Sequence, residues 1–323
     1  MRVLWCKRVR ALMVLLALST TAVGARQQVT PRHSDGKAPV ISETVAVQVM
    51  LDRAGFSPGE IDGREGTNLK RALAAFQSAN GLPASGSIDQ PTWQKLDERV
   101  GHQPPLISYT ISDADVSGPF TPDIPSDLTA QAKLDALGYR DLPEALGERF
   151  HARPSLLMSL NPGASLARGG EMITVPNVIT SPAATATTPV TIVVTKATSA
   201  LTVEDETGKT IVFAPVTSGS EHDPLPIGTW KVDGVQQNPS FHYNPALFWD
   251  ANPAHAKATI KPGPNNPVGT VWIDLSKPHY GIHGTPEPSQ IGHVQSHGCV
   301  RLTNWDAQRV AALVKPGTKV IFR

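Results

Sequence analysis

Two short segments near the C-terminus carry the side chains best suited to covalent chemistry. Residues 281–285 contain His283, and residues 296–301 contain His297 and Cys299. A cysteine is a strong nucleophile only as its thiolate, so a base or a positive charge must overcome its ordinary pKa of about 8.5. A thiol beside two histidines therefore predicts a cysteine nucleophile served by an imidazole base.

Both histidines are candidates for that base. His297 lies two positions before Cys299, and side chains two apart in an extended segment share one face. His283 is separated from the cysteine by a loop long enough to fold back on it. No neighbouring carboxylate is placed to orient an imidazole ring. The backbone carbonyl of Gly284 is the closest group that can do so.

The other residues of the segment are of types that could support an acyl transfer. Gly298 permits a tight turn and leaves backbone N–H groups free to form an oxyanion hole, a contribution of roughly 3–4 kcal/mol. Ser296 is expected to support the turn. Arg301 has a planar fork that suits a substrate carboxylate, and a structural salt bridge is the alternative for it.

Two other interpretations of the segment remain open. His283, His293, His297 and Cys299 together have the residue types of a zinc site. Gly292 and Gly298 argue against the helix that would present a histidine pair four residues apart, so we predict no metal and no cofactor. Alternatively, the cysteine is buried and inert. His293 and three more distant histidines, His242, His255 and His279, are interpreted as ordinary loop residues.

Composition limits the classes of function. The 323 residues are 40% hydrophobic and 18% charged, with a formal net charge of +1. These values suit two or three globular domains and do not suggest a nucleic-acid partner. Proline slightly outnumbers glycine, at 29 against 26 residues, which favours strands, loops and linkers over a helical bundle.

The N-terminus has the pattern of an export signal over residues 1–25. Four basic residues precede the apolar run 11–18, and residues 23–25 are small enough for cleavage. An uncleaved membrane anchor is the alternative. Either form places the rest of the chain outside the cytoplasm, in the periplasm or cell wall. Cleavage would remove Cys6, leaving Cys299 without a disulfide partner in a compartment where free thiols oxidise.

After a linker over residues 26–42, residues 43–98 predict three short helices. The second is the clearest, because Leu69, Ala72, Leu73 and Phe76 recur at helical spacing after Thr67, a plausible cap. The order of several short motifs, among them Ile61-Asp62-Gly63, Phe76-Gln77 and Thr92-Trp93, resembles the peptidoglycan-binding domain type 1. A bare three-helix module is the alternative.

Residues 101–125 are rich in Pro, Ser and Asp and are expected to be a second linker. Residues 126–178 predict helical faces around 142–150 and 156–160 and a strand at 172–176. Their order resembles a degenerate LysM module, another glycan binder, with an anonymous spacer as the alternative. A third linker is expected at residues 180–189.

From residue 190 the periodicity changes to short β-branched strands, with Thr207-Gly208 as a hairpin turn and a helix near 306–314. We therefore expect a mostly-β domain over residues 190–323, with long loops such as 236–267. The predicted chain is multidomain, with a small α-helical bundle, a small α/β middle module and a β-sandwich with long loops.

The C-terminal segment resembles the signature of L,D-transpeptidases with the YkuD-type catalytic domain. The resemblance rests on His283-Gly-Thr, Ser296-His-Gly-Cys-Val-Arg, the upstream Pro226-Ile-Gly-Thr and residues 263–269. It implies that Cys299 attacks the third residue of a tetrapeptide stem of peptidoglycan, releases D-Ala and passes the acyl group to an amine, forming a 3→3 cross-link. It also implies that His283 is the base and that His297, Gly298, Gly284 and Ser296 support the loop.

Two alternative functions remain at this stage. An L,D-carboxypeptidase would share the thioester step and use water as the acceptor. A non-catalytic wall-binding protein would have lost the chemistry, which the intact pair of His283 and Cys299 argues against. In every case the expected partner is peptidoglycan, with the membrane involved only through the export signal.

Overall fold

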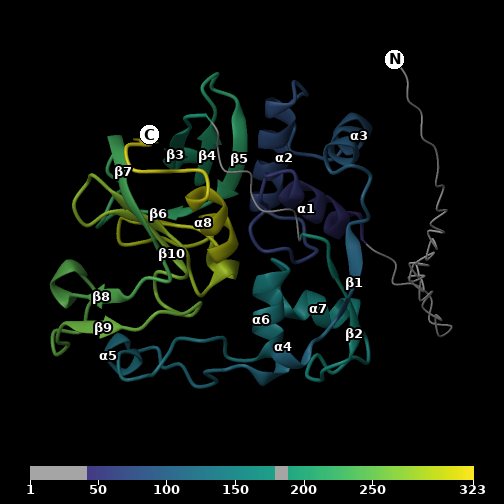
Figure 1. Cartoon of the computed structure of the whole chain (residues 1–323). Helices are drawn as coiled ribbons and strands as arrows, with labels where there is room; N and C mark the ends of the chain where they lie inside the picture. Colours follow the sequence, from purple (N-terminus) through teal and green to yellow (C-terminus); the bar gives the residue numbers. More distant parts are fainter. Residues whose placement is uncertain (1–41, 179–187) are drawn as a thin grey trace, which may run out of the picture. The chain divides into compact units, whose positions relative to one another are not determined.

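Three short helices open the described part of the chain. In this computed structural model, which describes residues 42–178 and 188–323, they are α1 (Glu43–Arg53), α2 (Thr67–Ala79) and α3 (Gln90–Arg99) (Figure 1). The side chains of Ser42 and Asp89 cap α1 and α3. The prediction that Thr67 caps α2 was wrong, because Gly66 occupies the cap position and Thr67 is the first helical residue.

The expected export signal lies outside the described residues, as do most of the linkers expected before residue 43 and around residues 180–189. No helix in the described ranges 42–178 and 188–323 is both long enough and apolar enough to cross a membrane.

The middle of the chain is an α/β module that begins earlier than expected. Strand β1 (Leu106–Thr110) pairs antiparallel with β2 (Met172–Pro176), and α6 (Leu142–Arg149) and α7 (Pro154–Leu160) lie between them in sequence. The interpretation of residues 101–125 as a linker was therefore wrong, since β1 and the short helix α4 (Asp113–Ser117) lie there. A further short helix, α5 (Leu128–Gln131), follows.

The C-terminal part is mostly β, as predicted. Nine strands form one continuous mixed sheet in the order β5-β4-β3-β13-β7-β10-β11-β12-β6, where a β-sandwich was expected. The two edge strands, β5 and β6, are separated in the chain by Val216 alone, so the sheet nearly closes on itself. The bounds are β3 (Thr191–Thr195), β4 (Ala200–Glu204), β5 (Thr210–Pro215), β6 (Thr217–Ser218), β7 (Gly228–Gln237), β10 (Val271–Leu275), β11 (Gly281–His283), β12 (Val300–Arg301) and β13 (Lys319–Phe322).

The region expected as a long loop, residues 236–267, contains a second small sheet. Strands β8 (Phe241–Tyr243) and β9 (Ala258–Ile260) pair antiparallel, and we call residues 241–260 the hairpin. Its His255 bonds the hydroxyl of Tyr243 at 3.0 Å and the carboxylate of Asp127 at 2.9 Å. The middle module therefore braces the hairpin.

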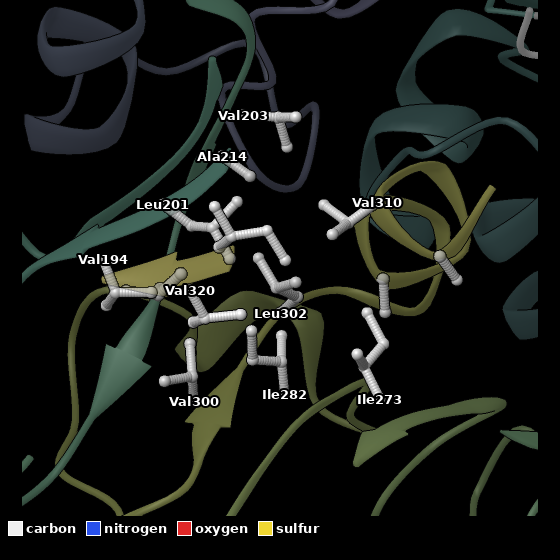
Figure 2. Close-up of a cluster of buried hydrophobic side chains, with 14 of the residues drawn as sticks. Val194, Leu201, Val203, Ala214, Ile273, Ile282, Val300, Leu302, Val310 and Val320 are labelled. Carbon is white, nitrogen blue, oxygen red and sulfur yellow. The ribbon is translucent and has the colours of Figure 1, made fainter. Parts of the chain in front are cut away.

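The interior of the nine-stranded sheet holds the main hydrophobic core. Figure 2 shows Ile282 and Val300 from β11 and β12 beside Leu302, Val310 and Val320, and each of these five side chains is fully buried. The helix α8 (Asn304–Ala311) contributes Ala307, Val310 and Ala311 to this core. Burial of Ile282 and Val300 places the side chains that alternate with them on the opposite face of the sheet.

The three parts of the chain share their cores. Phe213 of β5 packs in the same cluster as Phe56 and Phe76 of the helical bundle, and Val45 and Val49 of α1 pack with Leu157 of the middle module. The turn between α1 and α2 bonds both neighbours, with Ser57 N donating to Phe213 O and Ile61 N to His151 O. The described residues, 42–178 and 188–323, accordingly belong to one compact unit.

A buried ion network joins α1 to α8. Arg309 donates to Asp52 at 2.8 Å and to Asp306 at 3.0 Å, and Asp306 also accepts from Ser57 at 2.7 Å and from Thr303 at 2.8 Å. Burial alone would raise the pKa of Asp52, but the charges of Arg309 and His151 hold it below its usual range. The helical bundle is thus attached to the C-terminal part through buried charges that would be costly to separate.

We expect Arg309→Ala to lower the free energy of unfolding by about 3–5 kcal/mol, because it leaves buried Asp306 without a cation and buried Asp52 with His151 as its only cationic partner in the described residues. Urea denaturation followed by tryptophan fluorescence measures the change. The control is Lys95→Ala, which removes an exposed ion pair with Glu98 and should cost at most about 1 kcal/mol. Equal effects of the two substitutions would contradict the structural role of the network.

Candidate functional site

The candidate nucleophile and base lie on one face of adjacent strands. β11 and β12 run parallel, with Ile282 opposite Val300 and His283 opposite Arg301. Because Ile282 and Val300 face the core, His283 and Arg301 face away from it, and Cys299 shares the face of Arg301. Cys299 lies in the bend directly before β12, and the charge of Arg301 acts on both His283 and Cys299, so the fold brings both residues near Arg301 although the loop between the strands separates them in sequence.

His283 has a defined tautomer. Its Nδ1 lies 2.7 Å from the carbonyl oxygen of Gly284, so Nδ1 carries the proton and Nε2 carries the free lone pair. This is the orienting contact that the sequence indicated. The ring also stacks on Trp272 of β10, with centroids 5.4 Å apart.

The electrostatics of His283 keep it neutral. Burial, together with the charge of Arg301, lowers its pKa to about 3, and the bond to Gly284 opposes this only in part. An unprotonated imidazole is therefore the state present at neutral pH. Its Nε2 lone pair is free to accept a proton, but a ring with this low pKa is a weak base, and an imidazolium formed on it would lose its proton readily.

Cys299 is half-buried and unpaired, and its Sγ donates to the carbonyl oxygen of His279 at 3.8 Å. Burial raises the thiol pKa above its usual value. The backbone of Gly281 and the charge of Arg301 act against this rise, and Asp223 adds to it. The resting nucleophile is thus a thiol. Its activation requires proton transfer to a base or a change in the surrounding charge.

The turn before the cysteine is held by Ser296. Its hydroxyl donates to Cys299 O at 2.7 Å and accepts from Gly219 N at 2.7 Å, and its N–H donates to Gly219 O. Ser296 therefore supports the turn rather than facing solvent, as expected. Gly298 adopts a φ of +96°, and a Cβ there would lie 2.7 Å from Tyr280 Cε1.

His297 turns away from the thiol toward the hairpin. Its Nε2 donates to Asp250 at 2.8 Å, and its ring packs edge-on against Phe248 with centroids 5.1 Å apart. Its Nδ1 is buried without a hydrogen-bond partner in the described residues, as is Nε of Arg301. No group of three or more His, Cys, Asp or Glu side chains in residues 42–178 and 188–323 has an arrangement that could hold a metal ion.

Sequence reasoning missed three residues of the site. Asp250 comes from the hairpin, Asp223 from the loop between β6 and β7, and Tyr280 from the turn before β11. Tyr280 directly precedes the Gly281 that was singled out, so proximity in sequence was a usable signal. Asp250 and Asp223 lie far from the motif, and no local pattern marks them. His279 participates through its backbone carbonyl, which its side-chain type does not predict.

Comparison with known proteins identifies two domains. Residues 189–322 match the family model for the L,D-transpeptidase catalytic domain YkuD, and residues 42–96 match the model described as "Putative peptidoglycan binding domain". Neither of these two matches covers the middle module, and its LysM-like interpretation stays a prediction.

The chain is similar to the "Probable L,D-transpeptidase YbiS" of Escherichia coli, with 30% identity over 52% of this chain and 55% of the relative. It is also similar to the "Putative L,D-transpeptidase YkuD" of Bacillus licheniformis, with 50% identity over 19% of this chain and 36% of the relative. The chain thus spans about half or less of the curated relatives it matches. Among solved structures, an L,D-transpeptidase from Xylanimonas cellulosilytica covers 87% of this chain and 93% of its own, with 15% identity and a TM-score of 0.37.

The raised thiol pKa predicts the pH dependence of alkylation. The rate of iodoacetamide labelling of Cys299 should rise through pH 9 without an acid plateau, because the folded thiol holds its proton to higher pH than a free cysteine. Mass spectrometry of the labelled protein, with glutathione as the reference thiol, measures this. A plateau of reactivity below about pH 6 would instead reveal a resting thiolate–imidazolium pair.

We expect Gly298→Ala to slow labelling of Cys299 by at least about tenfold, because the new methyl group would meet Tyr280 and displace the cysteine turn. Gly317→Ala is the matched control. Gly317 has a similar φ of +90° with nothing within 4 Å of the added Cβ, so that variant should lose about 1–2 kcal/mol of stability and keep its thiol reactivity. A normal labelling rate for Gly298→Ala would contradict the predicted clash with Tyr280.

Proposed function

Residues 189–322 form an L,D-transpeptidase catalytic domain of the YkuD family, and from this premise we propose that the protein is a cysteine-dependent transpeptidase acting on peptidoglycan. The observation that carries the proposal is the face shared by His283, Cys299 and Arg301, with Nε2 of His283 free as a base. We propose that the enzyme forms 3→3 cross-links from tetrapeptide stems in the periplasm or cell wall, after export.

In the acylation step, the thiol of Cys299 attacks the carbonyl carbon of the third stem residue while Nε2 of His283 accepts the thiol proton. The backbone N–H groups of Gly298 and Cys299 would stabilise the oxyanion. Because burial makes the imidazolium of His283 strongly acidic, it readily returns the proton to the departing D-Ala amine. A thioester on Cys299 remains.

The charged residues beside the nucleophile suit a peptide substrate. Arg301 has a buried Nε without a hydrogen-bond partner in the described residues, and we assign its guanidinium to a carboxylate of the donor stem. His297, held by Asp250, links the cysteine turn to the hairpin, which covers this side of the site through Phe248.

The accessory parts would concentrate the enzyme on its polymer. The helical bundle matches a peptidoglycan-binding domain, and we propose that the middle module binds glycan in the manner of the LysM modules that it resembles. Since both share cores with the catalytic part, a bound polymer would present its stems in a limited range of orientations.

Purified protein incubated with tetrapeptide stems should release D-Ala and form stem dimers, as detected by mass spectrometry. Cys299→Ala should abolish both products and the adduct with a carbapenem, and His283→Gln should slow acylation by about 10²–10⁴-fold. His293→Ala, at an exposed histidine of the same loop, is the control and should behave as wild type. D-Ala release without dimers would favour the carboxypeptidase, and a carbapenem adduct on Cys299→Ala would identify a different nucleophile.

A further inference from the structure

Asp223 presents an unsatisfied carboxylate oxygen close to the nucleophile. In the described part of the chain, Oδ2 of Asp223 is buried and has no hydrogen-bond partner. The carboxylate is near enough to act on two groups of the site, raising the pKa of both Cys299 and Tyr280 beyond the larger effect of burial. A buried carboxylate oxygen without a hydrogen-bond donor destabilises the folded protein. This points to a donor that a ligand supplies.

The loop that carries Asp223 is held firmly in place. Residues 219–227 follow β6, which pairs with β12 so that Ser218 lies opposite Val300. Gly219 exchanges two hydrogen bonds with Ser296, the residue that supports the cysteine turn. Asp223 N donates to Ser220 Oγ at 2.9 Å, and Ser220 N donates to Asp223 O at 2.9 Å. The position of Asp223 beside the cysteine turn is therefore built into the fold.

The negative charge of Asp223 favours a cationic ligand over an anionic one on this side of the site. The charged or titratable groups coupled to the thiol are Arg301 on β12, Tyr280 before β11 and Asp223 itself, and Oδ2 of Asp223 has no partner in the described residues. A substrate carboxylate would be repelled by Asp223 and attracted by Arg301. A primary ammonium would satisfy Oδ2 with an N–H donor and a charge of the correct sign.

Two stacked aromatic rings that such a ligand could contact lie next to Asp223. The neighbouring His222 stacks on Trp249 of the hairpin, with centroids 4.3 Å apart, and Trp249 is 60% exposed. The stem of an amine-bearing chain has apolar carbons that can lie against this ring while its ammonium reaches the carboxylate.

We propose that Asp223 binds the ammonium group of the acyl acceptor and so directs the second half of the reaction toward an amine rather than water. This inference rests on the proposed transpeptidase function. It assigns the two charged sides of the site to the two substrates, with Arg301 on the donor side and Asp223 on the acceptor side.

The acceptor step then balances as follows. The ammonium bound at Asp223 releases one proton to solvent and becomes an amine. Its nitrogen attacks the thioester carbon, the new C–N bond forms and the C–S bond breaks. One N–H proton passes to Nε2 of His283 and then to the departing sulfur, which restores the Cys299 thiol and the neutral imidazole.

The experiment measures how the acyl-enzyme partitions between an amine and water. Wild type, Asp223→Asn and Glu221→Gln are given a tetrapeptide stem as donor and D-methionine amide, which has an ammonium and no carboxylate, as acceptor, and aminolysis and hydrolysis products are counted. We expect Asp223→Asn to lower the aminolysis-to-hydrolysis ratio by about tenfold or more and to raise KM for the acceptor, since a hydrogen bond to a charged group is lost. Glu221→Gln removes the same charge from an exposed neighbour and should leave the ratio unchanged.

A second readout separates binding from a structural role. Removing the carboxylate should speed iodoacetamide labelling of Cys299 at neutral pH severalfold, because a charge that disfavours the thiolate is gone. Damage to the loop would slow labelling and acylation together, and that outcome would overturn the proposal. An unchanged product ratio, or a rise in KM for the donor stem alone, would also overturn it. D-Ala release by wild type tests the transpeptidase function separately, because it precedes the acceptor step.

Discussion

The rest of the structure depends on the buried charge of Arg309. It lies between Asp52 of α1 and Asp306 of α8, and Asp306 in turn accepts from Ser57 and Thr303. None of these charges can be withdrawn from its partners without a large desolvation cost. Since α8 begins three residues after β12, the network ties the helical bundle to the segment that follows Cys299. The bundle and the candidate site are therefore parts of one continuous scaffold.

In the nearly closed sheet, successive side chains along a strand face either the hydrophobic core or the candidate site. Ile282 and Val300 are fully buried inside it, while His283 and Arg301, one residue further along each strand, face the other way. A shift of one residue in the register between β11 and β12 would exchange these sets, placing an arginine in the apolar core. The packing shown in Figure 2 therefore also determines the alignment of the proposed base and nucleophile.

The resting site holds neutral partners rather than an ion pair. Burial lowers the pKa of His283 to about 3 and raises that of Cys299, so the proton stays on sulfur until a substrate arrives. A neutral thiol resists oxidation better than a thiolate, which would matter for the exported enzyme that we propose. Asp223 strengthens this resting state, and a cation bound to it would weaken it. The same carboxylate can thereby select an acceptor and keep the sulfur less reactive until a cation binds.

The sequence by itself determined the elements whose signals are local. The spacing of Leu69, Leu73 and Phe76 predicted α2, the β-branched runs predicted the strands, and the motif around Cys299 and His283 predicted the chemistry and the role of Gly284. Only the tertiary structure decided that the parts share their cores, that β1 lies in an expected linker, and that Asp250 and Asp223 join the site. Those features arise from contacts between segments far apart in the chain, where burial and charge pairing leave no periodic pattern in the sequence.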